Sequence, residues 1–171
     1  MGFTTGAADA APFALSIRPT RPDEATVREL LDQLDSYLAS LYAPEDNHIL
    51  GIEALLAPDI VFLGAWQGES LLGCGALRAM PGEADTSGRP YAEIKRMMVQ
   101  PAARGQRIGA RLLAALEDAA GERDLPLALL ETGRDQLEAV RLYERAGYTL
   151  RGTFGGYPDN GLSLFYEKRL A

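Results

Sequence analysis

Residues 91–120 (YAEIKRMMVQPAARGQRIGARLLAALEDAA) constrain the fold of this chain more than any other segment. They read as a strand, a short loop that contains arginine and glycine, and an amphipathic helix. A helix that starts at such a loop presents unpaired backbone N–H groups and a partial positive charge at its N-terminus. Arg104, Arg107 and Arg111 flank that point. The segment therefore predicts a phosphate site at the start of the helix.

The overall composition is that of an ordinary globular domain. A chain of 171 residues, 47% hydrophobic and 24% charged, is long enough to bury one core. Its net charge of -7 argues against non-specific binding to nucleic acid, and we expect no nucleic-acid partner. Five of the 17 lysines and arginines nevertheless lie within residues 95–111, so positive charge is concentrated at the predicted phosphate site.

Cysteine and histidine content limits the chemistry. Cys74 and His48 are the only residues of their types, which excludes an intramolecular disulfide, a cysteine metal cluster and a multi-histidine zinc site, and we expect no metal. No apolar run is long enough for a membrane span, and the start of the chain does not follow a signal-peptide pattern. We therefore expect a cytoplasmic protein with no membrane partner. Residues 1–12 are expected to be a flexible tail, and residues 13–171 a single domain.

Apolar periodicity and turn residues predict an alternation of strands and helices. Strands are expected at 13–19, 59–66, 71–79, 91–99, 126–132, 149–154 and 162–170, and helices at 22–42, 49–56, 107–121 and between Asp135 and Gly147. Asp135, with Glu138 three residues later, is expected to cap the last helix, and Gly147 to end it. Adjacent hairpins together with helix crossovers imply an α/β protein: one mixed sheet with helices on both faces.

Two segments resemble the motifs of a known family. Residues 91–120 resemble motif A of the GNAT superfamily of acyl-CoA-dependent N-acyltransferases, and residues 127–151 (LALLETGRDQLEAVRLYERAGYTLR) resemble its motif B. The element order over 13–170 is similar too, so the resemblance covers nearly the whole chain. It implies a single-domain GNAT-like fold, with a mixed, mostly antiparallel sheet, that forms an N-acyltransferase domain.

The resemblance also implies a reaction. We expect transfer of an acetyl group from acetyl-CoA, the acyl-donor cosubstrate, to a primary amine by direct attack in a ternary complex. The acceptor is either a small-molecule amine or a protein amine. One alternative is transfer of a different acyl group, and another is a sensor or regulatory module that holds acyl-CoA without turnover. A homodimer is an expectation by resemblance only.

The family pattern for the phosphate loop is Gln/Arg-x-x-Gly-x-Gly/Ala. Here Arg104 holds its first position and Gly109 its last, while Arg107 replaces the middle glycine and adds a cation. By resemblance, backbone groups of Met98 and Val99 would pair with the pantetheine arm. The pyrophosphate would be held by the amides of Arg104, Gly105, Gln106, Arg107, Ile108, Gly109 and Ala110.

Two residues are expected to carry the chemistry. An alkylammonium has a pKa of about 10, so a base or a water chain must remove a proton before the amine attacks. Glu93 matches the position where some family members place a general base; the alternative is a surface carboxylate that pairs with Lys95 or an arginine. Tyr143 matches the motif B tyrosine that points at the cofactor sulfur in the family, and its alternative role is packing in the core.

The segment after the first helix usually lines the acceptor pocket in the resembled fold. The candidate acceptor contacts are Tyr42, Glu45, Asp46, His48, Arg96 and Tyr157. The alternatives are a capping or surface position for His48, a solvated pair for Glu45 and Asp46, an exposed loop position for Tyr157, and a structural ion pair for Arg96. The acidic residues of the N-terminal helical region favour a basic acceptor. Cys74 is either an acyl carrier or a buried core residue, and its apolar context favours the core residue.

Overall fold

The computed structural model describes residues 14–170, so the tail expected at 1–12 lies outside the described residues. The strands are β1 (Leu15–Pro19), β2 (Ile60–Gln67), β3 (Ser70–Met80), β4 (Tyr91–Val99), β5 (Leu127–Gly133), β6 (Thr149–Arg151) and β7 (Ser163–Arg169). The helices are α1 (Ala25–Leu41), α2 (Ile52–Leu55), α3 (Ile108–Glu122) and α4 (Leu137–Arg145). The element order is the one predicted from the sequence.

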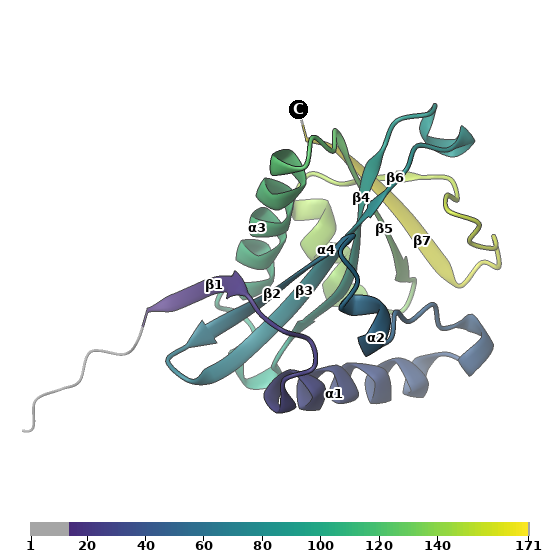
Figure 1. Cartoon of the computed structure of the whole chain (residues 1–171). Coiled ribbons are helices and arrows are strands. Elements are labelled where there is room, and N and C mark those ends of the chain that lie inside the picture. Colours follow the sequence, from purple (N-terminus) through teal and green to yellow (C-terminus); the bar gives the residue numbers. More distant parts are fainter. Residues whose placement is uncertain (1–13, 171) are drawn as a thin grey trace, which may run out of the picture.

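The strands form one seven-stranded sheet in the order β1-β2-β3-β4-β5-β7-β6. Among the strand pairs of residues 14–170, β4–β5 alone is parallel, and every other pair is antiparallel. Figure 1 shows the twisted sheet with α1 and α3 on opposite sides of it. The predicted α/β fold, with a mixed, mostly antiparallel sheet and helices on both faces, is therefore confirmed.

Each face of the sheet has its own core cluster. On the α3 side, five apolar residues at helical spacing are buried: Ile108, Leu112, Leu113, Leu116 and Ala120. On the α1 side, Val27, Leu30 and Leu31 pack against Phe62 and Trp66. Strand β2 supplies both clusters because successive side chains of a strand point to opposite faces. Full burial of each leucine stabilises the fold by roughly 1.5–3 kcal/mol.

Strands β4 and β5 pair at only two positions, Ala92 with Ala128 and Glu93 with Leu129. Beyond these positions β4 stays paired with β3 and β5 with β7, but not with each other. The register of β4 against β3 also shifts opposite Gly75, and Arg96 adopts a left-handed backbone with a φ of 58°. The sheet therefore opens between its two central strands.

Three local expectations need correction. Asp135 does not cap α4: the N-cap is Gln136, which makes no side-chain capping bond. The amide of Gln136 bonds the Gly133 carbonyl at 3.0 Å, so Asp135 lies in a turn before the helix. The helix expected at 49–56 is a single turn, α2, and the strand expected at 149–154 ends at Arg151, where Gly152 follows and the chain leaves the sheet edge.

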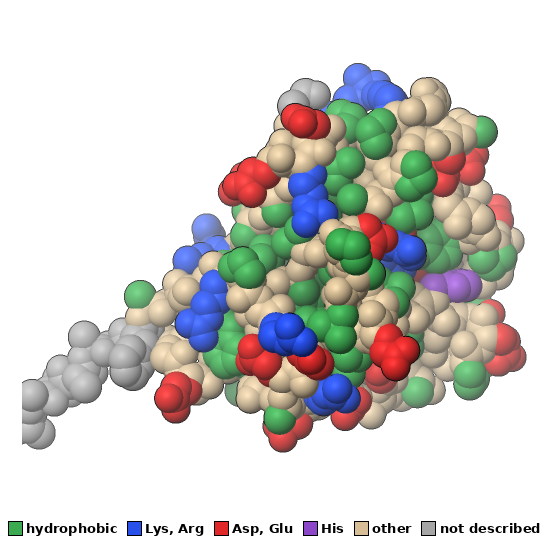
Figure 2. All heavy atoms as spheres, in the orientation of Figure 1, with side chains coloured by type: hydrophobic (Ala, Val, Ile, Leu, Met, Phe, Trp, Pro, Cys, Tyr) green, Lys and Arg blue, Asp and Glu red, His purple; other side chains and the backbone are tan. Residues whose placement is uncertain are grey.

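Within residues 14–170, no helix has the length and apolar character needed to cross a bilayer. Figure 2 shows acidic and basic side chains interspersed on the visible face, without a continuous basic patch.

Candidate active site

Two adjoining hollows lie where β4 and β5 separate. The larger, called the groove here, has a volume of about 860 Å³ and runs between the second half of β4, the start of α3 and the length of α4. The smaller, called the inner cavity, has a volume of about 100 Å³ and lies between β4, β5 and the end of α1. Four residues line both hollows: Leu34, Met97, Gln136 and Tyr143. A ligand in the groove can therefore meet a ligand in the inner cavity beside Tyr143.

The groove collects nearly all the residues expected to bind the cofactor. Its lining includes Met98, Val99, Arg104, Gly105, Arg107, Ile108, Gly109 and Ala110, whereas Gln106 is exposed outside it. Because β4 has parted from β5 here, the backbone on this side of β4 has no partner strand. An unpaired strand edge is suited to an extended ligand that carries amide groups.

The start of α3 provides a site for negative charge. Its first turn holds no acidic side chain that would oppose the unpaired amides and the helix dipole. Glu138 of α4 also lines the groove, where it pairs with Arg104 at 3.2 Å. Arg107, the N-cap, has a φ of 60°, the conformation that glycine adopts without cost. Arg107 thus keeps the backbone conformation suited to the glycine of the family pattern while adding a cation. Arg141 and Arg145 line the groove from α4.

Glu93 lies at the point where the two strands part and is only 5% exposed. Lys95 Nζ donates to Glu93 Oε1 at 3.2 Å and to the Tyr157 hydroxyl at 2.8 Å, and that hydroxyl donates to the same carboxylate oxygen. Burial, followed by the negative charge of Glu93, raises the pKa of Tyr157 above its usual value. The phenol therefore stays protonated at neutral pH and remains a hydrogen-bond donor.

Tyr143 is buried between the groove and the inner cavity and packs edge-on against Tyr148. Burial is the main cause of a raised pKa for Tyr143, and the charge of Glu131 adds to it. Tyr143 is thus both a core residue and a protonated donor that faces the two hollows. The two roles weighed from the sequence do not exclude each other.

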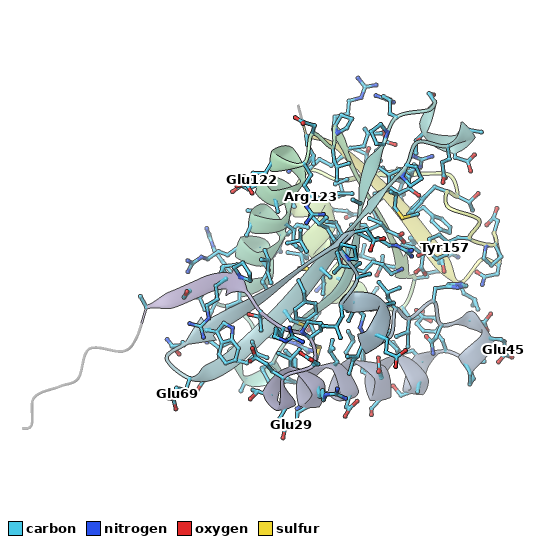
Figure 3. The ribbon with its side chains drawn as sticks, in the orientation of Figure 1. Glu29, Glu45, Glu69, Glu122, Arg123 and Tyr157 are labelled. Carbon is cyan, nitrogen blue, oxygen red and sulfur yellow. The ribbon has the colours of Figure 1, made fainter. Side chains whose placement is uncertain are left out.

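The expected acceptor contacts divide into two groups. Tyr42, Asp46, His48 and Arg96 line the inner cavity, and Tyr157 packs edge-on against His48 with ring centroids 5.0 Å apart. Glu45 is exposed and does not line the cavity, and Figure 3 shows it at the outer edge of the molecule.

Two of the acidic side chains of α1 also lie away from the cavity. Glu29 and Asp32 are exposed, and Figure 3 shows Glu29 directed away from the sheet. These two carboxylates therefore do not contribute contacts that would select a basic acceptor.

Glu131 was missed in the sequence, where 126–132 has the pattern of a buried strand. It lines the inner cavity from β5, and its Oε1 accepts a hydrogen bond from Ser163 Oγ at 2.7 Å. A charged residue near the end of an apolar strand was the available signal. The cavity thus holds carboxylates on both separated strands, Glu93 on β4 and Glu131 on β5.

Cys74 is buried in the core below α1, as its apolar context predicted. Its Sγ donates to the Arg96 carbonyl at 3.4 Å, and burial raises the pKa of the thiol to about 12. A thiol that is protonated and buried is a poor nucleophile. Among the described residues, no group of three or more histidine, cysteine, aspartate or glutamate side chains is placed to hold a metal ion.

Comparisons with known proteins point to one family. The sequence profile of the Acetyltransferase (GNAT) family matches residues 18–148. An "IAA acetyltransferase" of Azospirillum brasilense is 44% identical over 156 residues, which is 91% of this chain and 98% of that protein.

Solved structures give the same result. A Klebsiella pneumoniae protein assigned to the acyl-CoA N-acyltransferases is 33% identical, with a TM-score of 0.75 over 92% of this chain and 98% of that one. The PaiA N-acetyltransferase of Thermoplasma acidophilum, solved in complex with coenzyme A, shares the fold with a TM-score of 0.65 at 20% identity, over 92% and 99% of the two chains.

Proposed function

The chain belongs to the Acetyltransferase (GNAT) family, and we propose that it transfers an acetyl group from acetyl-CoA to the nitrogen of a primary amine. One observation carries this proposal: the groove and the inner cavity meet at Tyr143. The groove has the volume and the mainly cationic charged lining for a nucleotide thioester. The inner cavity has the size and polar lining for a small amine. The transferred group would cross where the two hollows share their lining.

Acetyl-CoA is proposed to lie with its pantetheine arm along the free edge of β4, beside Met98 and Val99. Its pyrophosphate would sit on the amides at the start of α3, between Arg104 and Ala110. Support comes from the unpaired helix N-terminus and from Arg107, whose charge adds to that of the helix dipole. The Thermoplasma acidophilum protein of the same fold was solved in complex with coenzyme A, which supports coenzyme A as the class of ligand.

Glu93 is proposed to accept the proton of the ammonium, directly or through a water molecule. The free amine then attacks the thioester carbonyl carbon, so that a C–N bond forms and the C–S bond breaks. The nitrogen loses its remaining extra proton, and the departing thiolate takes up a proton to leave as the CoA thiol. Tyr143 donates a hydrogen bond to the departing sulfur, whose negative charge it stabilises. Direct attack is favoured over an acyl-enzyme because the Cys74 thiol is buried with a raised pKa.

The test is an assay of purified protein with acetyl-CoA and a panel of primary amines. Release of free CoA is measured together with the mass and the acetylated position of the product. The proposal expects CoA and an N-acetylated amine in equal amounts. Release of CoA that is independent of amine, or an acetyl group found only on oxygen, would overturn it. Parallel reactions with longer acyl-CoA donors test the preference for acetyl.

A further inference from the structure

Arg96 is the most deeply buried cation of the inner cavity. The residue is 9% exposed, and its Nη1 pairs with Oδ1 of Asp35 on α1. Its Nε is buried and has no hydrogen-bond partner among residues 14–170. Arg96 also lines the inner cavity. Arg96 thus borders a hollow while one of its buried nitrogens has no hydrogen-bond partner among the described residues.

This arrangement is unfavourable for the fold by itself. A buried donor that lacks an acceptor loses its bond to water without a replacement. A buried guanidinium needs a well-placed anion, yet Asp35 bonds one nitrogen and is itself 41% exposed. The left-handed backbone of Arg96, with a φ of 58°, adds strain for a residue that has a Cβ. Such strain concentrates at sites that bind ligands.

The unused part of the guanidinium has the shape that a carboxylate fits. An arginine binds a carboxylate in a two-point contact through two neighbouring nitrogens. Among residues 14–170, Asp35 bonds Nη1 and no group bonds Nε, so the edge of the guanidinium that carries Nε has no anion. The same chain shows such a contact elsewhere: Arg21 binds Asp23 through Nε at 2.9 Å and Nη2 at 2.8 Å.

We propose that Arg96 binds a carboxylate of the acceptor, so that the substrate is an amine that also carries a carboxylate, such as an amino acid. This inference rests on the proposed N-acetyl transfer. Arg96 and Glu93 line the same cavity from β4, and Glu131 lines it from β5. The acceptor's ammonium would be attracted to the two glutamates while its carboxylate is held by Arg96. Arg96 would thus set specificity, and Glu93 would handle the proton.

The test compares matched acceptors with the wild-type protein. Each of several α- and ω-amino acids is assayed beside its own carboxamide, which keeps the amine and removes the negative charge. The proposal expects kcat/KM at least about tenfold higher for the acid, equivalent to about 1.4 kcal/mol. The amine's own basicity does not explain such a preference, because removing the carboxylate lowers the ammonium pKa and leaves more free amine.

Three variants test whether Arg96 is the residue that causes the preference for the acid over the carboxamide. Arg96→Gln should bring the ratio of acid to carboxamide close to one, and Arg96→Lys should leave an intermediate ratio because charge remains without the planar fork. Arg21→Gln, which removes an exposed arginine with the same type of contact, should leave the ratio unchanged. The ratio is measured within each variant, so a loss of folded protein affects both acceptors equally. If Arg96→Gln does not fold, Arg96→Lys and the wild-type ratio still decide the question.

Two outcomes overturn the inference alone: equal rates for acid and carboxamide in the wild type, or a ratio that survives Arg96→Gln. A protein that acetylates the carboxamides but not the acids leaves N-acetyl transfer intact and refutes the role of Arg96. A protein that acetylates neither member of any pair, while binding acetyl-CoA, counts against both proposals.

Discussion

The hydroxyl of Tyr157 donates a hydrogen bond to the carboxylate of Glu93, although the two residues are 64 positions apart in the chain. Tyr157 belongs to the connection between β6 and β7, which contains Gly155 and Gly156 with φ values of 61° and 77°. These glycines allow the turn that directs the phenol back to β4. The bond therefore ties a loop near the C-terminus to the carboxylate that we propose as the base.

Replacing Tyr157 with phenylalanine should reduce catalysis without unfolding the protein. Loss of a hydrogen bond to a charged group is worth roughly 1.5–3 kcal/mol, so kcat/KM for the amine should fall by roughly ten- to a hundredfold. Steady-state kinetics and thermal unfolding measure the two effects. Tyr166→Phe is the matched control. It removes a phenol that donates to Glu144 at 3.0 Å, and this hydrogen bond lies away from both hollows. Equal losses in the two variants would contradict a special role for Tyr157.

The two carboxylates of the inner cavity should differ in their effect on rate. If Glu93 is the base, Glu93→Gln should lower kcat by roughly 10²–10⁴-fold while the affinity for acetyl-CoA stays the same. Glu131→Gln should mainly raise KM for the amine, since that carboxylate accepts a bond from Ser163 and would act by attracting the ammonium. The reverse pattern would transfer the role of base to Glu131. Equal activity of both variants with the wild type would leave water as the proton acceptor.

Variants of Tyr143 and of its neighbour Tyr148 distinguish a catalytic effect from a packing effect. Both are buried, and their rings pack edge-on at 5.9 Å, but only Tyr143 lines the hollows. Tyr143→Phe should lower kcat by roughly tenfold or more, because the departing sulfur loses a donor. Tyr148→Phe should leave kcat near that of the wild type. Similar rates for the two variants, measured with saturating acetyl-CoA, would show that Tyr143 serves only in packing.

Buried tyrosines should make the fold sensitive to alkali. Burial is the main cause of raised pKa values for Tyr42, Tyr91, Tyr143, Tyr148, Tyr157 and Tyr166. For Tyr166 the value rises to about 12. The unfolded chain therefore loses phenol protons first as pH rises, so the free energy of unfolding should be steady below a pH of about 10 and fall above it.

Urea unfolding across this pH range, with phenolate absorbance followed in parallel, measures the alkaline effect. The Tyr148→Phe variant should lose stability less steeply, because one buried phenol is gone. The limits of about pH 8 and about pH 11 lie on either side of the ordinary phenol pKa. A free energy of unfolding that stays constant between them would contradict the predicted loss of stability in alkali.

Local patterns in the sequence were sufficient where structure depends on neighbouring residues. The strand predicted at 91–99 is β4 to the residue. The helix predicted as amphipathic at 107–121 is α3, and its apolar residues form its buried face. The periodicity of apolar residues indicates which side of a helix or strand is buried, and it can be seen without knowing the rest of the fold.

Relationships set by the order of strands were not predictable in the same way. Arg96 meets Asp35 61 positions away, and Glu131 reaches the cavity only because β5 is the parallel neighbour of β4. The left-handed backbone at Arg96 also has no local signal, since arginine is not a residue that favours it. The sequence around Asp135 has the pattern of a helix cap. The hydrogen bond from the Gln136 amide to the Gly133 carbonyl forms a turn there instead, and the helix begins after Gln136.

The central claim is that acetyl-CoA binds in the groove with its phosphates at the start of α3. Calorimetric titration with acetyl-CoA of the wild type, Gly109→Ala and Gly109→Asp tests it most directly. A Cβ at Gly109 would lie 3.2 Å from the flexible end of Leu142, so alanine reports the effect of packing alone. Aspartate adds a negative charge where we place the phosphates.

We predict one bound acetyl-CoA per chain for the wild type, an affinity within several-fold of it for Gly109→Ala, and a loss of about a hundredfold or more for a folded Gly109→Asp. Absence of binding by the wild type, or equal affinities for the alanine and aspartate variants, would contradict the account.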